Sequence, residues 1–149
     1  MRLLDHIKIE HKELRPQIDE LRTVADSIGT VSDKELMAGL EQSYDFLAHH
    51  LTPHAKSEEK VLYGLVAKYS HTDAGTEIMT RDHAEVAKLT TRLKGLMKDE
   101  LDHNALRHVL YSLHSLISLH FAKEEEFILP VLEDHLTKDD DEHAADHLH

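Results

Sequence analysis

The chain has 149 residues, of which 40% are hydrophobic and 31% charged, the balance of a single globular domain. A formal net charge of −12 argues against nucleic acid or an anionic membrane as the main partner. The sequence contains no cysteine, which excludes disulfides, thiolate nucleophiles, iron–sulfur clusters and cysteine-based zinc sites.

The N-terminal stretch MRLLDHIKIEHKEL carries charges throughout and has no apolar segment of the signal-peptide type. No apolar run in the chain approaches membrane-spanning length. We therefore expect a cytoplasmic protein without a membrane partner.

Apolar residues spaced three and four apart recur in four segments, which predicts four long amphipathic helices. The expected helices span residues 3–28, 32–69, 73–97 and 102–136. Pro16 lies inside the first and predicts a bend or a restart, and Thr52-Pro53 predicts a kink or a new helix in the second. Because the connections are short, neighbouring helices should be antiparallel. The expected fold is an all-α, up-down-up-down four-helix bundle.

Helix ends and core positions follow from the same pattern. Ser32-Asp33-Lys34-Glu35 forms a capping box at the start of the second helix. The third stripe includes Ile78, and the fourth includes Phe127 or Ile128, followed by Val131. We expect residues 1–136 to form the bundle and residues 137–149, an acidic histidine-containing tail, to fray or to form a short helix or loose turn.

Fifteen histidines are several times what a domain of this size usually carries. Most lie off the apolar stripes, but some fill gaps within them, and two of those precede a glutamate by four residues, which places both side chains on one helix face. The ionisable residues expected to point into the bundle are His11, His54, Glu58, His83, His120 and Glu124.

Burying these groups without compensation would cost several kcal/mol per ionised group. One compensation is a web of His–Glu hydrogen bonds. The other is metal, which balances carboxylate charge and binds neutral imidazole. Two glutamates and four histidines suit a dinuclear site, in which each carboxylate can bridge two divalent ions and open positions remain.

The order of these residues repeats once along the chain. A lone histidine is followed by His-x-x-x-Glu in the first half, and the same order returns in the second half. Aligning His11 with His83 also pairs Glu13 with Glu85. Each half should therefore supply one histidine and one His-x-x-x-Glu to a pseudo-twofold site.

The segments IEHKELR, PHAKSEE, RDHAEV and LHFAKEEE resemble those of the hemerythrin-like (HHE cation-binding) family, and the resemblance extends to about Leu136. It implies a non-haem di-iron centre with two oxo- or hydroxo-bridged iron ions, for which manganese or zinc could substitute. The terminal ligands would be His11, His54, His83 and His120, and the bridging carboxylates would be Glu58 and Glu124.

The chain departs from the pattern of oxygen-carrying hemerythrins. Those proteins have a second histidine four residues after the first on the third helix, where this chain has Ala87. On the fourth helix they have an aspartate five residues after the histidine; this chain has Glu125 at that position and offers Glu124 as the ligand. The two metals should then be nearly equivalent and more open. The chain is thus more similar to the symmetric hemerythrin-like branch, associated with iron or oxygen sensing and with peroxide or nitric oxide chemistry.

Several other side chains are assigned to simpler roles. Glu59 and Glu125 are expected to face outward rather than to bond the ligand histidines. Core packing is favoured over site contact for Tyr44, Tyr63 and Tyr111. Histidines expected in solvent or at helix ends are His6, His49, His50, His71, His103, His108, His114, His135, His143 and His147.

A ferritin-like site is disfavoured because Glu-x-x-His occurs only once, at a helix junction. Metalloprotease, phosphate-loop and serine-hydrolase motifs are missing from the sequence. We expect the site to take peroxide, oxygen or nitric oxide, with catalase-like peroxide consumption if the protein is an enzyme. The alternative is an iron- or oxygen-sensing or oxygen-binding module without turnover. The sequence leaves the oligomeric state open.

Overall fold

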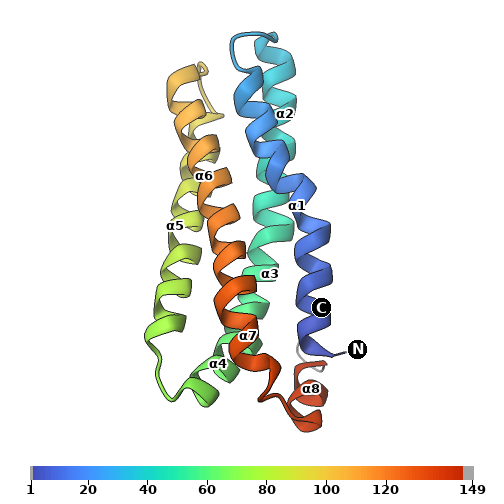
Figure 1. The fold of residues 1–149 in the computed structure, drawn as a ribbon. Helices are drawn as coiled ribbons and strands as arrows, with labels where there is room; N and C mark the ends of the chain where they lie inside the picture. The colour runs from blue at the N-terminus through green and yellow to red at the C-terminus, as the bar shows by residue number, and fades with distance from the viewer. Residues whose placement is uncertain (1, 146–149) are drawn as a thin grey trace.

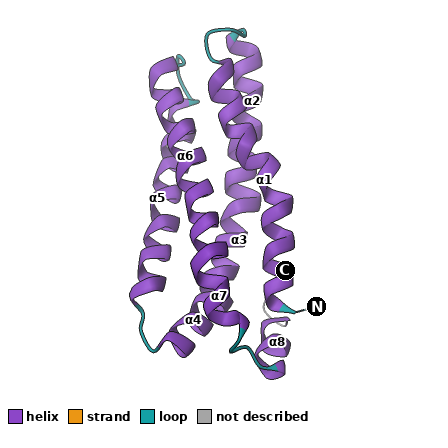
Figure 2. Cartoon of the chain, in the orientation of Figure 1, coloured by secondary structure: helices purple, strands orange, loops and turns teal. Residues whose placement is uncertain are grey.

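The computed structural model describes residues 2–145, and every regular element within that range is helical (Figure 2). This confirms the all-α prediction. The long elements are α1 (Leu3–Ser27), α2 (Asp33–Phe46), α5 (Ala74–Leu96) and α6 (His103–Lys123).

The second and fourth predicted helices are composite. In each, short π-helical segments, in which the backbone hydrogen bonds span five residues instead of four, separate α-helical pieces. After α2 come η1 (Leu47–Leu51), α3 (Thr52–Ser57), η2 (Glu58–Leu62) and α4 (Tyr63–Ser70). After α6 come η3 (Glu124–Ile128) and α7 (Leu129–Glu133).

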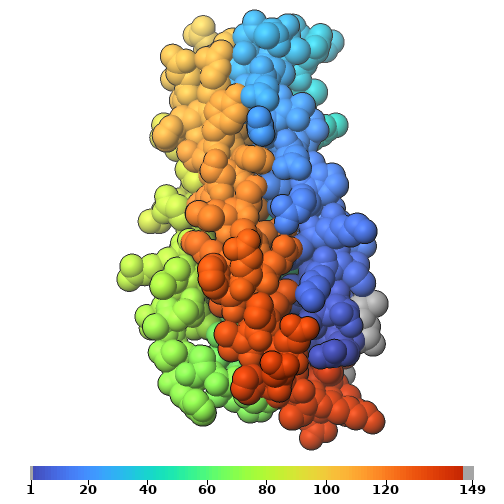
Figure 3. Space-filling model, in the orientation of Figure 1, coloured from blue at the N-terminus to red at the C-terminus, as the bar shows by residue number. Residues whose placement is uncertain are grey.

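The helices pack side by side as a bundle. Contacts join α1 to α6, α5 to α6, α1 to α2 and α2 to α5. Figure 1 shows the chain rising in α1, returning through α2, α3 and α4, rising again in α5 and returning through α6 and α7. In the space-filling view, α6 and α7 lie between α1 and α5 along the front face (Figure 3). Residues of both halves therefore meet in the interior.

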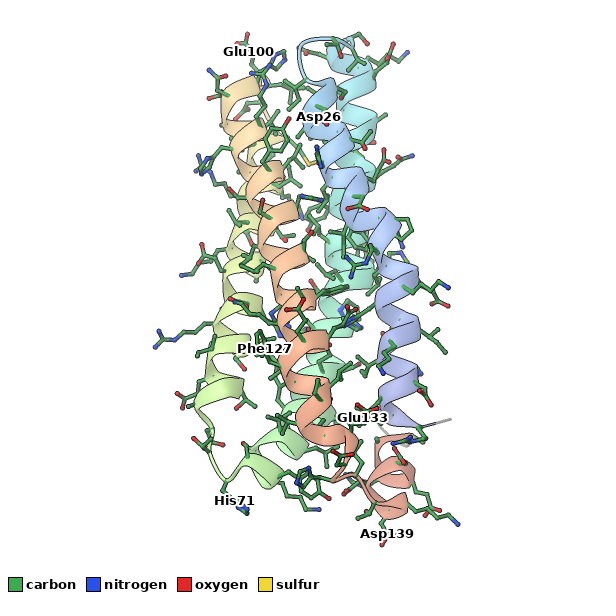
Figure 4. The ribbon with its side chains drawn as sticks, viewed as in Figure 1. Asp26, His71, Glu100, Phe127, Glu133 and Asp139 are labelled. Atoms are coloured by element: carbon green, nitrogen blue, oxygen red, sulfur yellow. The ribbon has the colours of Figure 1, made fainter. Side chains whose placement is uncertain are left out.

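The helix ends follow local sequence. The Ser32 hydroxyl oxygen accepts a hydrogen bond from the Glu35 N–H at 3.2 Å, the first half of the expected capping box. Gly29 ends α1 with a φ of +90°, which glycine adopts without a steric penalty. His71 adopts a left-handed conformation with φ +60° at the turn between α4 and α5 (Figure 4).

Neither Pro16 nor Pro53 interrupts the run of helical turns in which it lies. α1 is continuous through Pro16. Thr52 has helical backbone angles rather than the extended angles of an N-cap, and its hydroxyl donates to the Leu47 carbonyl at 2.8 Å. The π-helical segment η1 ends immediately before Thr52, and its wider turn leads the helix into Pro53.

The π-helical segment η3 changes which apolar residues face the core. One extra residue in the turn rotates the following side chains, so Ile128 is 8% exposed whereas Phe127 is 65% exposed on the outer face (Figure 4). Leu132 is likewise buried in place of Val131. The period of 3.6 assumed for a regular helix does not allow for this bulge. The prediction that Ile78 is a core residue is also wrong: in the regular helix α5 the neighbouring Met79 is buried instead.

The interior consists of two apolar clusters with a polar layer between them. On α1, Ile7 belongs to one cluster and Leu14 to the other, and His11 lies between them. In the fourth helix, Phe121 and Ile128 belong to different clusters, with Glu124 between them. The apolar clusters therefore hold the helices together on both sides of the ionisable residues and exclude water from them.

Residues 137–145 of the expected tail are described, and they include a short helix, α8 (Lys138–Ala145). The backbone N–H of Leu3 donates to Asp141 Oδ1 at 3.0 Å, the Tyr69 hydroxyl donates to Asp140, and Ala144 is buried in the apolar cluster that contains Leu3. His147 lies outside the described residues. Among the described helices, none combines the length and the apolar character needed to cross a membrane.

Candidate metal centre

The structure brings all six predicted site residues into the polar layer between the two apolar clusters. His11 comes from α1, His83 from α5 and His120 from α6, while His54 lies on α3. All are buried except His83, which is partly exposed. The geometry of their donor atoms decides what these residues could hold.

Each of the two glutamates is the first residue of a π-helical segment. Glu58 begins η2, and Glu124 begins η3. π-helical turns are rare and occur mainly at functional sites, because the extra residue re-aims nearby side chains at the expense of regular hydrogen bonding. In both halves the bulge lets the glutamate and the apolar residues that follow it face the interior together.

Glu58 lies at the centre of the cluster. Its Oε2 is 3.4 Å from His11 Nε2 and 3.3 Å from His54 Nε2. Its Oε1 is 3.6 Å from His83 Nε2. The two oxygens of one carboxylate therefore face histidines from different halves of the chain, the arrangement needed for a carboxylate bridge.

Glu124 completes the other side. Its Oε1 is 2.8 Å from His120 Nε2, and its Oε2 is 4.0 Å from His11 Nε2. His83 Nε2 and His120 Nε2 are 2.8 Å apart. Two groups could each hold a metal ion, and they share Glu58: His11, His54 and Glu58, and Glu58, His83, His120 and Glu124.

An outer ring of carboxylates fixes the orientation of the four imidazoles. Because a carboxylate only accepts, the Nδ1–H of each ring donates outward and leaves the Nε2 lone pair facing the centre. The Nδ1–carboxylate distances are 3.1 Å for His11–Glu125, 2.6 Å for His54–Glu10, 2.9 Å for His83–Glu59 and 3.0 Å for His120–Asp82. The imidazoles are thus oriented as metal ligands.

The expectation that Glu59 and Glu125 only face outward is wrong. Both side chains are partly exposed, yet each reaches back to a histidine of the opposite half, because the π-helical turn directs the residue after the bridging glutamate along the helix surface. Glu10 and Asp82 are acceptors that the sequence prediction missed. The signal was present: each directly precedes a lone histidine, in IEH and in RDH.

The two central carboxylates cannot both be charged without a cation. Burial and the neighbouring Glu58 carboxylate raise the pKa of Glu124 to about 12. Burial also opposes the charge on Glu58, but its interactions with Glu124 and the surrounding histidines outweigh it and hold the pKa of Glu58 well below its usual range. In the metal-free protein Glu124 therefore keeps its proton.

The imidazoles differ in their charge balance. Burial opposes protonation of His54, but the Glu10 and Glu58 carboxylates overcome this and raise the pKa of His54 to about 9. The Glu58 and Glu59 carboxylates likewise outweigh burial and raise the pKa of His83. Burial, with the nearby His83, lowers the pKa of His120 despite its bond to Asp82. In the metal-free protein the cluster therefore binds protons at positions that metal cations would occupy.

The residues present fit a metal centre. Four inward-facing atoms are buried without a hydrogen-bond partner, an arrangement that is costly in a protein interior: His54 Nε2, Glu58 Oε1, Glu124 Oε1 and Glu124 Oε2. Donor atoms about 2.1 Å from one ion, at right angles, lie roughly 3 Å apart, which is close to the His83–His120 separation of 2.8 Å. Nitrogen and carboxylate donors together suit divalent transition metals.

Comparison with known proteins identifies the family of the chain. The family model for the hemerythrin HHE cation-binding domain matches residues 2–105, more than half of the chain. The chain belongs to the hemerythrin HHE cation-binding family. The matched range contains four of the six donors of this hemerythrin-domain protein, whereas His120 and Glu124 follow it in the sequence. No match was found among curated proteins or among solved structures.

The donor set of this hemerythrin-domain protein is symmetric, but its surroundings are not. The Phe121 ring stacks on His11 at a centroid distance of 4.0 Å, and the His11 side chain is 1% exposed. Phe121 follows His120 in the sequence as Ala55 follows His54, so its counterpart beside His83 is only a methyl group. The His83 side chain is 11% exposed. One side of the site is covered, and the other is open.

Tyr63 is buried in the apolar cluster that contains Leu62, but it also reaches the site, which corrects the expectation that it only packs in the core. Its hydroxyl oxygen is 3.3 Å from His83 Nε2 and 3.2 Å from His120 Nε2. Burial and the nearby Glu124 and Glu58 carboxylates raise the pKa of Tyr63, so its hydroxyl stays protonated. Tyr111, in contrast, is an exposed residue bonded to Asp26, and Tyr44 packs against the apolar core.

A cleft of about 260 Å³ leads from the surface between α3 and α5 to the side of the site where His83 lies. His83, His120 and Glu58 line its inner end. Ala55, on α3, and Ala87, on α5, line its walls. Ala87, whose place holds a histidine in the oxygen-carrying pattern, therefore contributes open space beside the site.

The other histidines within residues 2–145 lie outside the cluster. His114 bonds Asp19, and His103 bonds Asp33, both on the protein surface. His6 is closer to the site than predicted, because its Nε2 is 2.7 Å from Glu10 Oε2, and Glu10 in turn bonds His54. His6 is thus separated from the candidate ligand by one carboxylate.

Proposed function

We propose that this protein is a non-haem di-iron protein of the hemerythrin-like type, built on an up-down-up-down four-helix bundle, that consumes hydrogen peroxide. Two iron ions would share the bridging carboxylates Glu58 and Glu124. The terminal imidazole ligands would be His11 and His54 on one side, and His83 and His120 on the other.

The observation that carries the proposal is the protonated Tyr63 hydroxyl beside His83 and His120, the two histidines that also line the cleft. Peroxide chemistry needs such a proton donor, because cleavage of the O–O bond leaves an oxygen that must be protonated as water forms.

The iron pair, when bound, supplies the two-electron redox capacity for disproportionation, in which two hydrogen peroxide molecules give two waters and one dioxygen. The chain's own residues do the rest. The Tyr63 hydroxyl donates a hydrogen bond to the ligand beside His83 and His120, and the outer carboxylates hold the imidazoles in place. The two apolar clusters exclude bulk water and limit side reactions.

Oxygen evolution from hydrogen peroxide tests the proposal. The iron-loaded protein should evolve oxygen faster than an equal concentration of free ferric ion. Tyr63→Phe should keep the iron content and lower the rate by about tenfold or more, because general-acid groups typically contribute 10²–10⁴-fold. Tyr111→Phe is the matched control, since Tyr111 is exposed and bonds only Asp26 among the described contacts.

Absence of oxygen evolution, together with reversible oxygen binding by the ferrous form, would contradict the proposal. The protein would then be an oxygen-binding or sensing module without turnover. Nitric oxide binding to the ferrous form would be read by the same optical titration.

A further inference from the structure

We infer that the cleft between α3 and α5 binds the organic part of a small alkyl hydroperoxide, whose peroxide group lies at the His83 side of the site. The inference rests on the proposed peroxide function and deepens it, because it names an organic peroxide rather than hydrogen peroxide as the ligand. The inference is about binding of this ligand, and the size, the lining and the position of the cleft support it.

The size of the cleft exceeds what hydrogen peroxide needs. A water molecule's share of liquid volume is about 30 Å³, and hydrogen peroxide has only one more heavy atom. The cleft measures about 260 Å³. It therefore has room for an organic group several carbons in size next to the peroxide.

The lining changes from polar at the inner end to apolar along the walls. His83, His120 and Glu58 line the inner end. The walls consist mainly of aliphatic and aromatic carbon from Leu51, Ala55, Val86, Ala87, Ile117 and Phe121. This polarity matches a ligand with one oxygen-rich head and an apolar body, since binding sites for small molecules combine apolar walls with few convergent polar groups.

The pseudo-twofold relation shows that the space is specific to one side of the site. Aligning the two halves on His11 and His83 pairs Arg15 with Ala87, and aligning His54 with His120 pairs Ala55 with Phe121. Each half of the chain contributes one of the two alanines, and both line the cleft. Where Phe121 stands, its ring covers His11 at 4.0 Å, and the same residue at position 55 would cover His83.

The test compares an organic ligand with hydrogen peroxide on the iron-loaded protein. Cumyl alcohol, the unreactive analogue of cumene hydroperoxide, serves as a binding probe in saturation-transfer NMR, and optical titration follows both hydroperoxides. Ala55→Phe introduces the covering ring of the other half, and Ala87→Leu narrows the opposite wall. Ala38→Phe, at an exposed position of α2, is the matched control for adding a ring. Iron content and the unfolding temperature show whether each variant folds.

We expect saturable binding of cumyl alcohol that Ala55→Phe and Ala87→Leu each weaken by about tenfold, while Ala38→Phe leaves it unchanged. Cumene hydroperoxide should lose more of its optical response than hydrogen peroxide in both cleft variants. Cumyl alcohol binding that is absent or insensitive to both cleft variants, with hydrogen peroxide turnover intact, would overturn the inference alone. Variant-sensitive alcohol binding without any peroxide reaction would overturn the proposed function but would support the cleft as an organic-ligand site.

Discussion

His11 and Glu125 are hydrogen-bonded across the two halves of the chain, with Nδ1 3.1 Å from Oε1, although they lie 114 residues apart in the sequence. The reciprocal bond joins His83 to Glu59 at 2.9 Å. These bonds cross between the halves, whereas the Glu10–His54 and Asp82–His120 bonds stay within them. The outer carboxylates thus tie the duplicated units together around one polar layer.

Removing the charge of a cross-half acceptor should weaken metal binding. We expect Glu125→Gln to lower metal affinity by roughly 10–100-fold, because such carboxylates orient the ligating imidazole and raise its basicity. Competition with a chelator measures the affinity. Glu126→Gln, at the adjacent exposed position, should leave it unchanged. Equal losses in both variants would mean that the effect is one of general surface charge.

The protein as purified should hold about two iron ions per chain and show ferric charge-transfer bands, because the six donors form two groups that share Glu58. Chelation should lower the unfolding temperature, since it leaves several buried donor atoms without partners. Metal analysis and calorimetry on the same sample check both points. A metal-free protein with undiminished thermal stability would point instead to a hydrogen-bonded polar core.

Loss of a single donor should remove iron. His54→Ala and Glu124→Ala each delete a buried group that no other residue replaces, so we expect iron content well below that of the parent protein. His143→Ala, on α8 and outside the cluster, should retain the full content. Iron loss from the α8 variant equal to that of the other two would show that different histidines bind the metal.

Metal binding should release protons. The pKa of Glu124 is raised to about 12 and that of His54 to about 9, so both groups are protonated near neutral pH without metal. Ligands bind metal only when deprotonated, and metal affinity should therefore rise as pH increases from about 6 to 8. Calorimetry in buffers of different ionisation enthalpy counts the protons. Glu124→Gln should release about one proton fewer per chain, and an identical count would contradict protonation of Glu124.

Much of the site could be predicted from the sequence because helical periodicity is a local property. His11, His54, Glu58, His83, His120 and Glu124 fall in gaps of apolar stripes, and a spacing of four puts His and Glu on one face. The repeat of this order identified two equivalent halves. The family model supports the same domain type over residues 2–105.

The π-helical segments could not be predicted, because they have no sequence signature of the same strength and depend on packing around the glutamates. They rotated Phe127 out of the core and turned Glu59 and Glu125 toward histidines of the opposite half. Contacts between distant residues also need the packed structure: Glu10 and Asp82 stand next to His11 and His83 in the sequence, but they bond His54 and His120.

The sequence by itself determined an all-helical chain with a duplicated set of imidazoles and carboxylates, since residue type and spacing decide which face of a helix each side chain occupies. Only the tertiary structure decided that the two halves differ in access. Phe121 covers His11, whereas Ala55 and Ala87 leave a cleft beside His83 and His120. The physical reason is that access to the site depends on the combined volume of the side chains that four packed helices place around it. The sequence of one helix does not specify that combined volume.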